Sequence, residues 1–158
     1  MRDRLDSIEY LLDELDINLK IFGTGWDSIS VPSNIKNCFY GPALELDYAR
    51  AINGAKICLG FLNREAYDEI TTRSFEIPSS GGFLLAERTE QHSEILLEDV
   101  EAVFFSSKEE LARKVKYYLN NSEERELIKE RGYTKITKGD YSWESLIKDI
   151  LIQINREK

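Results

Sequence analysis

Apolar residues recur along the chain at two spacings, and these predict alternating helices and strands. Apolar positions every third or fourth residue are typical of amphipathic helices. We expect such helices at residues 5–15, 44–55, 72–79, 93–97, 107–119, 122–131 and 141–156. Short runs that are apolar at nearly every position are typical of buried strands. We expect strands at residues 17–22, 38–40, 56–61, 82–86 and 100–105.

Buried strands separated by helices indicate a parallel sheet with helices on both faces. We therefore expect a Rossmann-like, doubly wound α/β fold with about five or six strands. A chain of 158 residues is long enough for one such domain, which we place at residues 1–158. Sheets of this kind bind ligands at the carboxyl ends of their strands, so function is expected in loops 23–26, 41–43, 62–74 and 87–92.

Local signals mark several helix ends. Ser107 and Glu110 have the spacing of a capping box, in which a hydroxyl and a carboxylate satisfy free amides at a helix start. Gly81 and Gly82 are suited to the exit from the helix at 72–79. Gly132 follows a charged helical run and is expected to end it.

The charge of the chain narrows its possible partners. Lys and Arg number 21 and Asp and Glu number 29, so the net charge is 21 − 29 = −8. An acidic chain without a basic run is repelled by phosphate backbones, which argues against nucleic acid and against an anionic membrane surface. A single basic pocket remains compatible with this balance, because net charge does not describe one cleft.

The cysteines indicate a reducing compartment, and the apolar runs are too short to span a membrane. Cys38 and Cys58 lie in strand-like segments, have no CxxC spacing and are expected to be buried thiols rather than disulfide or zinc ligands. No apolar run approaches the ~20 residues that span a bilayer. The first residues are charged and have no signal-peptide core. We expect a cytoplasmic protein without a transmembrane segment.

The segment at 68–85 carries the clearest chemistry. The amides of Thr71, Thr72, Arg73 and Ser74 fall at a predicted helix start, where they could donate to an anion. The guanidinium of Arg73 adds a charged fork suited to a diphosphate. Glu76 lies one turn after Arg73, and its carboxylate could accept two hydrogen bonds from a vicinal diol such as a ribose. The alternative is an Arg–Glu pair on a solvated helix.

The same segment resembles a known family. Residues 72–85 read TRSFEIPSSGGFLL, which is similar to the donor-site motif of group 1 glycosyltransferases, and most of all to their spore-maturation-type branch. That motif belongs to the carboxyl-terminal half of the GT-B fold. The likeness extends over nearly the whole chain, through segments 21–26, 40–42, 48–53, 63–65 and 108–119. It implies a domain that binds a nucleotide-diphosphate sugar for transfer to an unknown acceptor.

The resemblance implies roles for individual residues. In that superfamily two acidic residues flank seven others, which here gives Asp68 and Glu76. Glu76 would hold the ribose and Asp68 would orient the sugar, with Glu69 as a rival because Asp68 is shorter than the usual Glu. Asp68, Arg73 and Glu76 would form the catalytic set. The other implied donor-binding residues are Gly23, Gly25 and Trp26 beside the phosphates, Tyr40 and Gly41 near the base, and Thr71, Thr72 and Ser74 at the diphosphate.

The resemblance also implies a mechanism and a partner. Helix-start amides and Arg73 would stabilise the leaving nucleoside diphosphate without a metal or another cofactor, and the chain has no DxD-type metal motif. The acceptor would bind an amino-terminal GT-B domain that this chain lacks, so we expect weak nucleotide binding and little transfer by the chain alone.

Two alternatives remain open from the residues. A non-catalytic receiver-like module would need an acidic cluster after its first strand, where this chain has Gly23, Thr24 and Gly25. A bare α/β interaction domain is the other. His92, the only histidine, could touch the donor, but a polar loop residue is the favoured interpretation.

Overall fold

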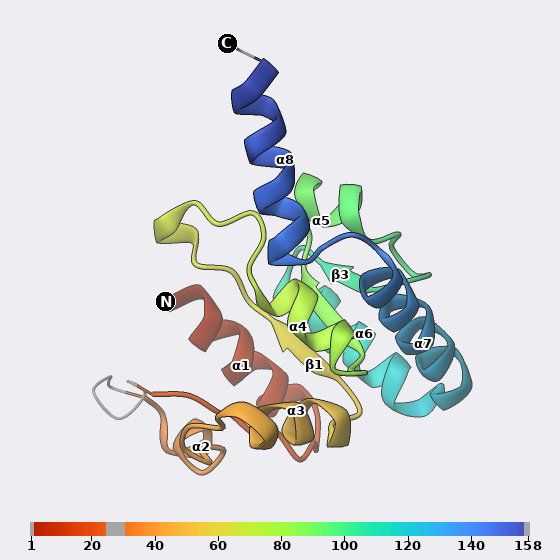
Figure 1. The fold of residues 1–158 in the computed structure, drawn as a ribbon. Coiled ribbons are helices and arrows are strands. Elements are labelled where there is room, and N and C mark those ends of the chain that lie inside the picture. Colours follow the sequence, from red (N-terminus) through yellow and green to blue (C-terminus); the bar gives the residue numbers. More distant parts are fainter. Residues whose placement is uncertain (1, 25–30, 157–158) are drawn as a thin grey trace.

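A parallel sheet forms the centre of the protein. The structure is a computed structural model that describes residues 2–24 and 31–156. Within them, β1 (Cys58–Gly60), β2 (Leu84–Glu87) and β3 (Val103–Phe105) pair in the order β1-β2-β3. Leu85 of β2 lies opposite Leu59 on one side and Val103 on the other. A helix precedes each of these parallel strands, and the carboxyl ends of all of them lie at the same edge of the sheet (Figure 1).

Helices precede, separate and follow these strands (Figure 1). They are α1 (Arg2–Glu14), α2 (Ser33–Lys36), α3 (Glu45–Gly54), the 3-10 helix η1 (Arg64–Ala66), α4 (Arg73–Ser79), α5 (Glu90–Ile95), α6 (Lys108–Asn120), α7 (Ser122–Lys138) and α8 (Trp143–Arg156). The predicted helices are therefore confirmed, with shifted ends at α1, α5 and α7.

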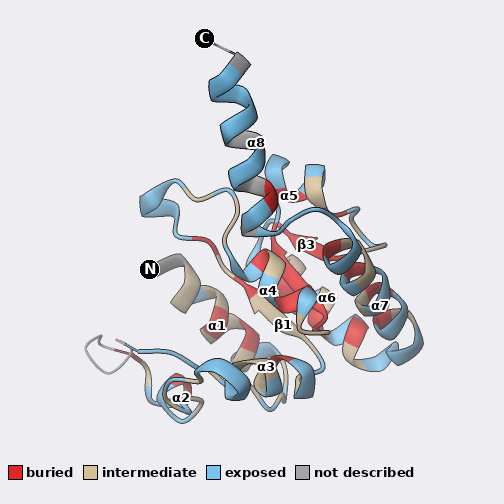
Figure 2. Ribbon diagram, in the orientation of Figure 1, coloured by how far each residue is buried: buried red, intermediate tan, exposed pale blue. Residues whose placement is uncertain are grey.

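The two faces of the sheet are covered by different helices, as the continuous apolar runs predicted. Phe83 and Leu85 point to a core shared with α1 and α6, whereas Leu84 and Ala86 point to a core shared with α3 and α4. α7 contributes to both cores, through Ile128 to the first and Ile136 to the second. Figure 2 shows β2 and β3 in the colour of buried residues, whereas most of β1 is half-buried. Every residue of β2 is buried, which explains why this segment shows no polar alternation. The predicted Rossmann-like α/β class is confirmed.

The sheet is smaller than the five or six strands expected. The predicted strands at 17–22 and 38–40 pair in parallel, but through a single bridge between Ile21 and Phe39. Ile21 N donates to the Cys38 oxygen at 2.7 Å, and Tyr40 N donates to the Ile21 oxygen at 3.0 Å. These segments pack on α1 and α2 in a separate small core. These two segments are extended and run in parallel, but they form no continuous ladder of backbone hydrogen bonds.

Two of the predicted helix-end signals act differently in the structure. Gly132 does not end a helix, because α7 continues to Lys138. A Cβ on Gly132 would lie less than 3.0 Å from the main-chain oxygen of Glu101, so the glycine permits close packing of α7 on that loop. The Ser107 hydroxyl accepts from Glu110 N at 3.2 Å, as a capping box requires, but the Glu110 carboxylate accepts from Ser106 N.

The last helix and the thiols complete the fold. α8 extends away from the sheet in Figure 1, with Ile147, Leu151 and Ile154 about half exposed. Among the described residues, no helix combines the length and the apolar character needed to cross a membrane. Cys38 and Cys58 are free, and both are half-buried rather than fully buried as predicted.

A cluster of charged side chains joins β2, β3 and α6. Arg88, directly after β2, bonds to Glu98 and donates to the Glu110 carboxylate at 3.3 Å. Lys114 of α6 lies 3.0 Å from the Glu98 carboxylate and donates to the Phe104 oxygen at 2.6 Å. Burial alone would raise the pKa of Glu110, but hydrogen bonds from Arg88, the Ser106 amide and Lys114 lower that pKa to about 2.

Replacing Glu110 by glutamine should lower the free energy of unfolding by about 1–3 kcal/mol at pH 7. Because the folded-state pKa lies below the ordinary 4.5, the wild type should lose this stabilisation as the pH falls from 4.5 towards about 2. Urea unfolding at pH 7 and pH 3 measures the difference, which should shrink in acid. Glu94→Gln, an exposed carboxylate of α5, is the control. An equal difference at both pH values would contradict the prediction.

Candidate functional site

The start of α4 lies at the carboxyl edge of the sheet, where the fold class places ligand sites. The loop that leads to it runs from the end of β1 through η1 to Thr72. Thr72 precedes α4 without making a side-chain cap, unlike Thr89 before α5 and Ser107 before α6. Within the described part of the chain, the amides of Thr71, Thr72 and Arg73 have no protein acceptor. α4 has seven residues, so its dipole is short and side chains must supply most of the charge.

Glu76 is exposed on the first turns of α4 and is held from a neighbouring helix. The hydroxyl of Tyr48, on α3, donates to Glu76 Oε2 at 2.8 Å. Burial, together with this hydrogen bond and the charge of Glu76, raises the pKa of Tyr48 to about 12. Tyr48 therefore stays a donor at neutral pH. One carboxylate oxygen is fixed by the protein, and no hydrogen bond from the described residues engages Oε1.

Two arginines, Arg73 of α4 and Arg4 of α1, act on each other at this edge. Burial lowers the pKa of Arg4, the positive charge of Arg73 lowers it further, and Glu87 opposes both. Arg4 Nε is buried and has no hydrogen-bond partner among the described residues, and its Nη2 lies 3.5 Å from the Leu62 oxygen. In residues 2–24 and 31–156, neither Arg4 nor Arg73 has a carboxylate within salt-bridge distance. The pair therefore forms a local positive site on a chain of net charge −8.

A nearly buried carboxylate holds the loop beside these arginines. Glu87 ends β2, and its Oε2 accepts from Leu62 N at 3.0 Å. Its Oε1 lies 3.6 Å from the Arg64 guanidinium, which belongs to η1. Both carboxylate oxygens are thus engaged with the loop that follows β1. This arrangement fixes the route from β1 towards α4.

Ser74 and His92 form a buried pair behind the start of α4. Ser74 Oγ lies 2.7 Å from His92 Nε2, and the Ser74 amide donates to the Thr71 oxygen at 3.0 Å. Ser74 was predicted to bind the donor, but its hydroxyl and its amide both have hydrogen-bond partners within the protein. His92 lies in α5 and is 0% exposed. The expectation of a polar loop residue at position 92 was wrong, because its ring has buried partners that the sequence does not reveal.

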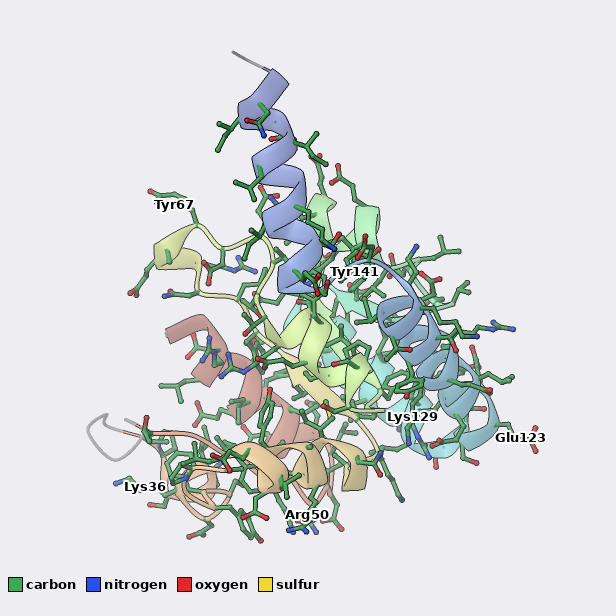
Figure 3. The ribbon with its side chains drawn as sticks, in the orientation of Figure 1. Lys36, Arg50, Tyr67, Glu123, Lys129 and Tyr141 are labelled. Atoms are coloured by element: carbon green, nitrogen blue, oxygen red, sulfur yellow. The ribbon has the colours of Figure 1, made fainter. Side chains whose placement is uncertain are left out.

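The acidic residues before α4 lie in the loop and not on the helix. Asp68 is half-buried and its amide donates to the Asn63 oxygen at 3.2 Å, whereas Glu69 is exposed. No contact joins either carboxylate to Glu76 in the part of the chain that the structure describes. Tyr67, 91% exposed, projects from the tip of this loop (Figure 3). The role of Asp68 stays a prediction.

The glycines predicted beside the donor lie at the ends of the bridged pair. Gly23 N donates to the Gly41 oxygen at 3.0 Å, and both residues have positive φ, 145° and 73°. Tyr40 is 54% exposed and its ring centroid lies 5.8 Å from that of Phe22. The structure therefore brings Gly23, Tyr40 and Gly41 to one edge. Gly25 and Trp26 lie outside the described residues.

Comparison with known proteins identifies the family. A family model described as "Glycosyl transferase-like" matches residues 4–152, which is nearly the whole chain. The chain belongs to this glycosyltransferase-like family. The match includes Arg73 and Glu76 and the three parallel strands, and it implies a sugar donor as substrate. A search of curated proteins found no match.

Several site residues of this glycosyltransferase-like chain were not predicted from the sequence. Arg4 is one polar position on an amphipathic helix, and Tyr48 counted as part of an apolar face. Glu87 directly follows a buried strand run, which is a usable signal, since polar residues at the carboxyl ends of parallel strands often face the ligand edge. Among the described residues, no group of three or more His, Cys, Asp or Glu side chains is placed to hold a metal ion.

Proposed function

We propose that this chain binds the nucleoside-diphosphate part of a sugar donor at the start of α4. The observation that carries the proposal is the combination of an exposed Glu76, aligned by Tyr48, with Arg4 and Arg73, neither of which forms a salt bridge with another described residue. A carboxylate with one free oxygen suits ribose hydroxyls, and guanidinium groups suit phosphate oxygens. Tyr40 and Gly41, on the neighbouring segment, would face the base.

The residues would act on the leaving group. Transfer of the sugar breaks its bond to the diphosphate, and negative charge grows on the diphosphate oxygens. Arg4 and Arg73 would stabilise that charge, together with the amides of Thr71 and Thr72. Glu76 would fix the ribose, so the sugar is presented in one orientation. In this proposal the arginines supply the positive charge, and transfer needs no metal. Asp68 would orient the sugar, with Glu69 as its rival.

The finer assignment rests on the motif at 72–85. We propose the spore-maturation-type branch of group 1 glycosyltransferases, and within it the carboxyl-terminal, donor-binding half of a GT-B fold. The family match supports a glycosyltransferase domain over a receiver-like or interaction module. Acceptor binding would need a second α/β half, so the purified chain should bind nucleotide and transfer little sugar.

Calorimetric titration with UDP, GDP and their sugar conjugates tests the proposal. One nucleoside diphosphate should bind, and Arg4→Met and Arg73→Met should each weaken it about tenfold or more, because each removes a charge-assisted contact to phosphate. Binding should also weaken with added salt. Arg131→Met, an exposed arginine on α7, is the control and should bind as the wild type does. Absence of binding by the wild type would refute the proposal.

A further inference from the structure

The first turn of α5 attaches to the chain on both sides of the α4 start. Thr89 Oγ1 donates to the Glu69 oxygen at 2.6 Å and accepts from His92 N at 3.1 Å. One turn further, His92 Nε2 meets Ser74 Oγ at 2.7 Å. The loop before α4 and the first turn of α4 are therefore held by neighbouring residues of one short helix.

The partners of His92 determine which ring nitrogen carries the proton. Nδ1 lies 2.8 Å from the main-chain oxygen of Glu87, which can only accept a hydrogen bond. Nδ1 is therefore protonated, and Nε2 of the neutral ring accepts from the Ser74 hydroxyl. The ring stacks on Phe104 with centroids 5.3 Å apart. His92 thus links the end of β2 to the start of α4 through two buried hydrogen bonds.

We infer that His92 is a positioning residue of the donor site: through Ser74 it holds the turn that carries Arg73 and Glu76. Ser74 lies next to Arg73 and two residues before Glu76, and it is 3% exposed. Thr72 makes no side-chain cap, so the kind of cap that Thr89 and Ser107 provide for α5 and α6 is missing here. The inference rests on the proposed function, because it assigns the pair a role in placing the two ligand-binding side chains.

Protonation of His92 would break this arrangement. An imidazolium carries hydrogens on both nitrogens, so the Ser74 hydroxyl would have to turn and a charge would be buried. Burial lowers the pKa of His92, while the hydrogen bond to Glu87 and the charge of Glu87 partly offset this. The other side chains packed against the His92 ring are Ser74 of α4 and Phe104 of β3, and neither of them titrates. Nucleotide binding should therefore decline only below pH 6.5.

Nuclear magnetic resonance tests the link without any ligand. His92 is the only histidine, so its ring nitrogens give unambiguous signals. We expect the Nδ1–H tautomer at pH 7, a midpoint below 6.5, and amide shifts of Arg73 and Glu76 that follow the same midpoint. An Nε2–H tautomer, or amides that do not respond to this titration, would overturn the inference.

Titration with UDP and GDP then tests the effect on the site. Ser74→Ala should weaken binding about tenfold, whereas Ser74→Thr, which keeps the hydroxyl, should stay within about twofold of the wild type. In His92→Gln, the decline of nucleotide affinity at low pH that depends on His92 should be absent. Unchanged affinity in folded Ser74→Ala would overturn the inference, and if His92→Gln does not fold, the Ser74 pair decides. If the wild type binds neither probe, the proposed function fails while the resonance result still decides the link.

Discussion

Gly132→Ala is expected to destabilise the protein by about 2–4 kcal/mol, although the same substitution in an exposed helix stabilises by about 1 kcal/mol. The added Cβ would lie less than 3.0 Å from the Glu101 main-chain oxygen. That oxygen cannot move easily, because the Glu101 amide donates to the Leu97 oxygen at 2.8 Å and its carboxylate accepts from Leu97 N at 2.9 Å. Backbone must therefore shift on one side or the other. Urea unfolding measures the loss.

Gly54→Ala is the matched control. Gly54 is the last residue of α3, and a Cβ there would meet nothing within 4 Å. Helix propensity should therefore act alone, and the free energy of unfolding should stay equal or rise by up to about 1 kcal/mol. If both alanine variants were equally stable, the close approach of α7 to the Glu101 loop would be ruled out.

Gly132 also shows why some elements could be predicted and others could not. Every residue of β2 and β3 is buried, so these strands appear in the sequence as apolar runs without polar alternation. Gly132 follows a charged run, which is typical of a helix end. A glycine is needed at this position, however, because the backbone of another segment passes close to it in the three-dimensional structure. The segment at 17–22 has strand-like composition, yet its pairing stops at Ile21 because ladder length depends on the partner segment.

The site divides in the same way. Arg73 and Glu76 lie on one short motif, so their spacing alone placed them on one helix turn. Arg4 of α1 lies within the electrostatic influence of Arg73, and Tyr48 of α3 donates to Glu76, so both roles arise from chain topology. His92 was misjudged because its buried partners, Ser74 and the Glu87 oxygen, come from other elements. Local chemistry is readable from a sequence, whereas convergence of distant segments is not.

Glu76→Ala is expected to weaken nucleoside-diphosphate binding on the order of 100-fold, because two hydrogen bonds to a charged carboxylate would be lost. Glu76 is exposed, so the alanine variant should keep the fold, and Glu123→Gln, which changes an exposed carboxylate of α7, is the control. Calorimetry with UDP and GDP measures the change. Tyr48→Phe should weaken binding less, since it frees Glu76 Oε2 but keeps the carboxylate.

The ribose itself provides the sharper test of Glu76. If its carboxylate accepts from the ribose hydroxyls, the wild type should prefer UDP or GDP over the corresponding 2′,3′-dideoxy diphosphate, which retains the phosphates and the base. Glu76→Ala should bind both ligands equally weakly, because the missing hydroxyls no longer have a partner. Arg73→Met should instead weaken both ligands by the same factor and keep the preference. A preference that survives in Glu76→Ala would place the ribose elsewhere, and would leave the exposed carboxylate at the start of α4 without a part in donor binding.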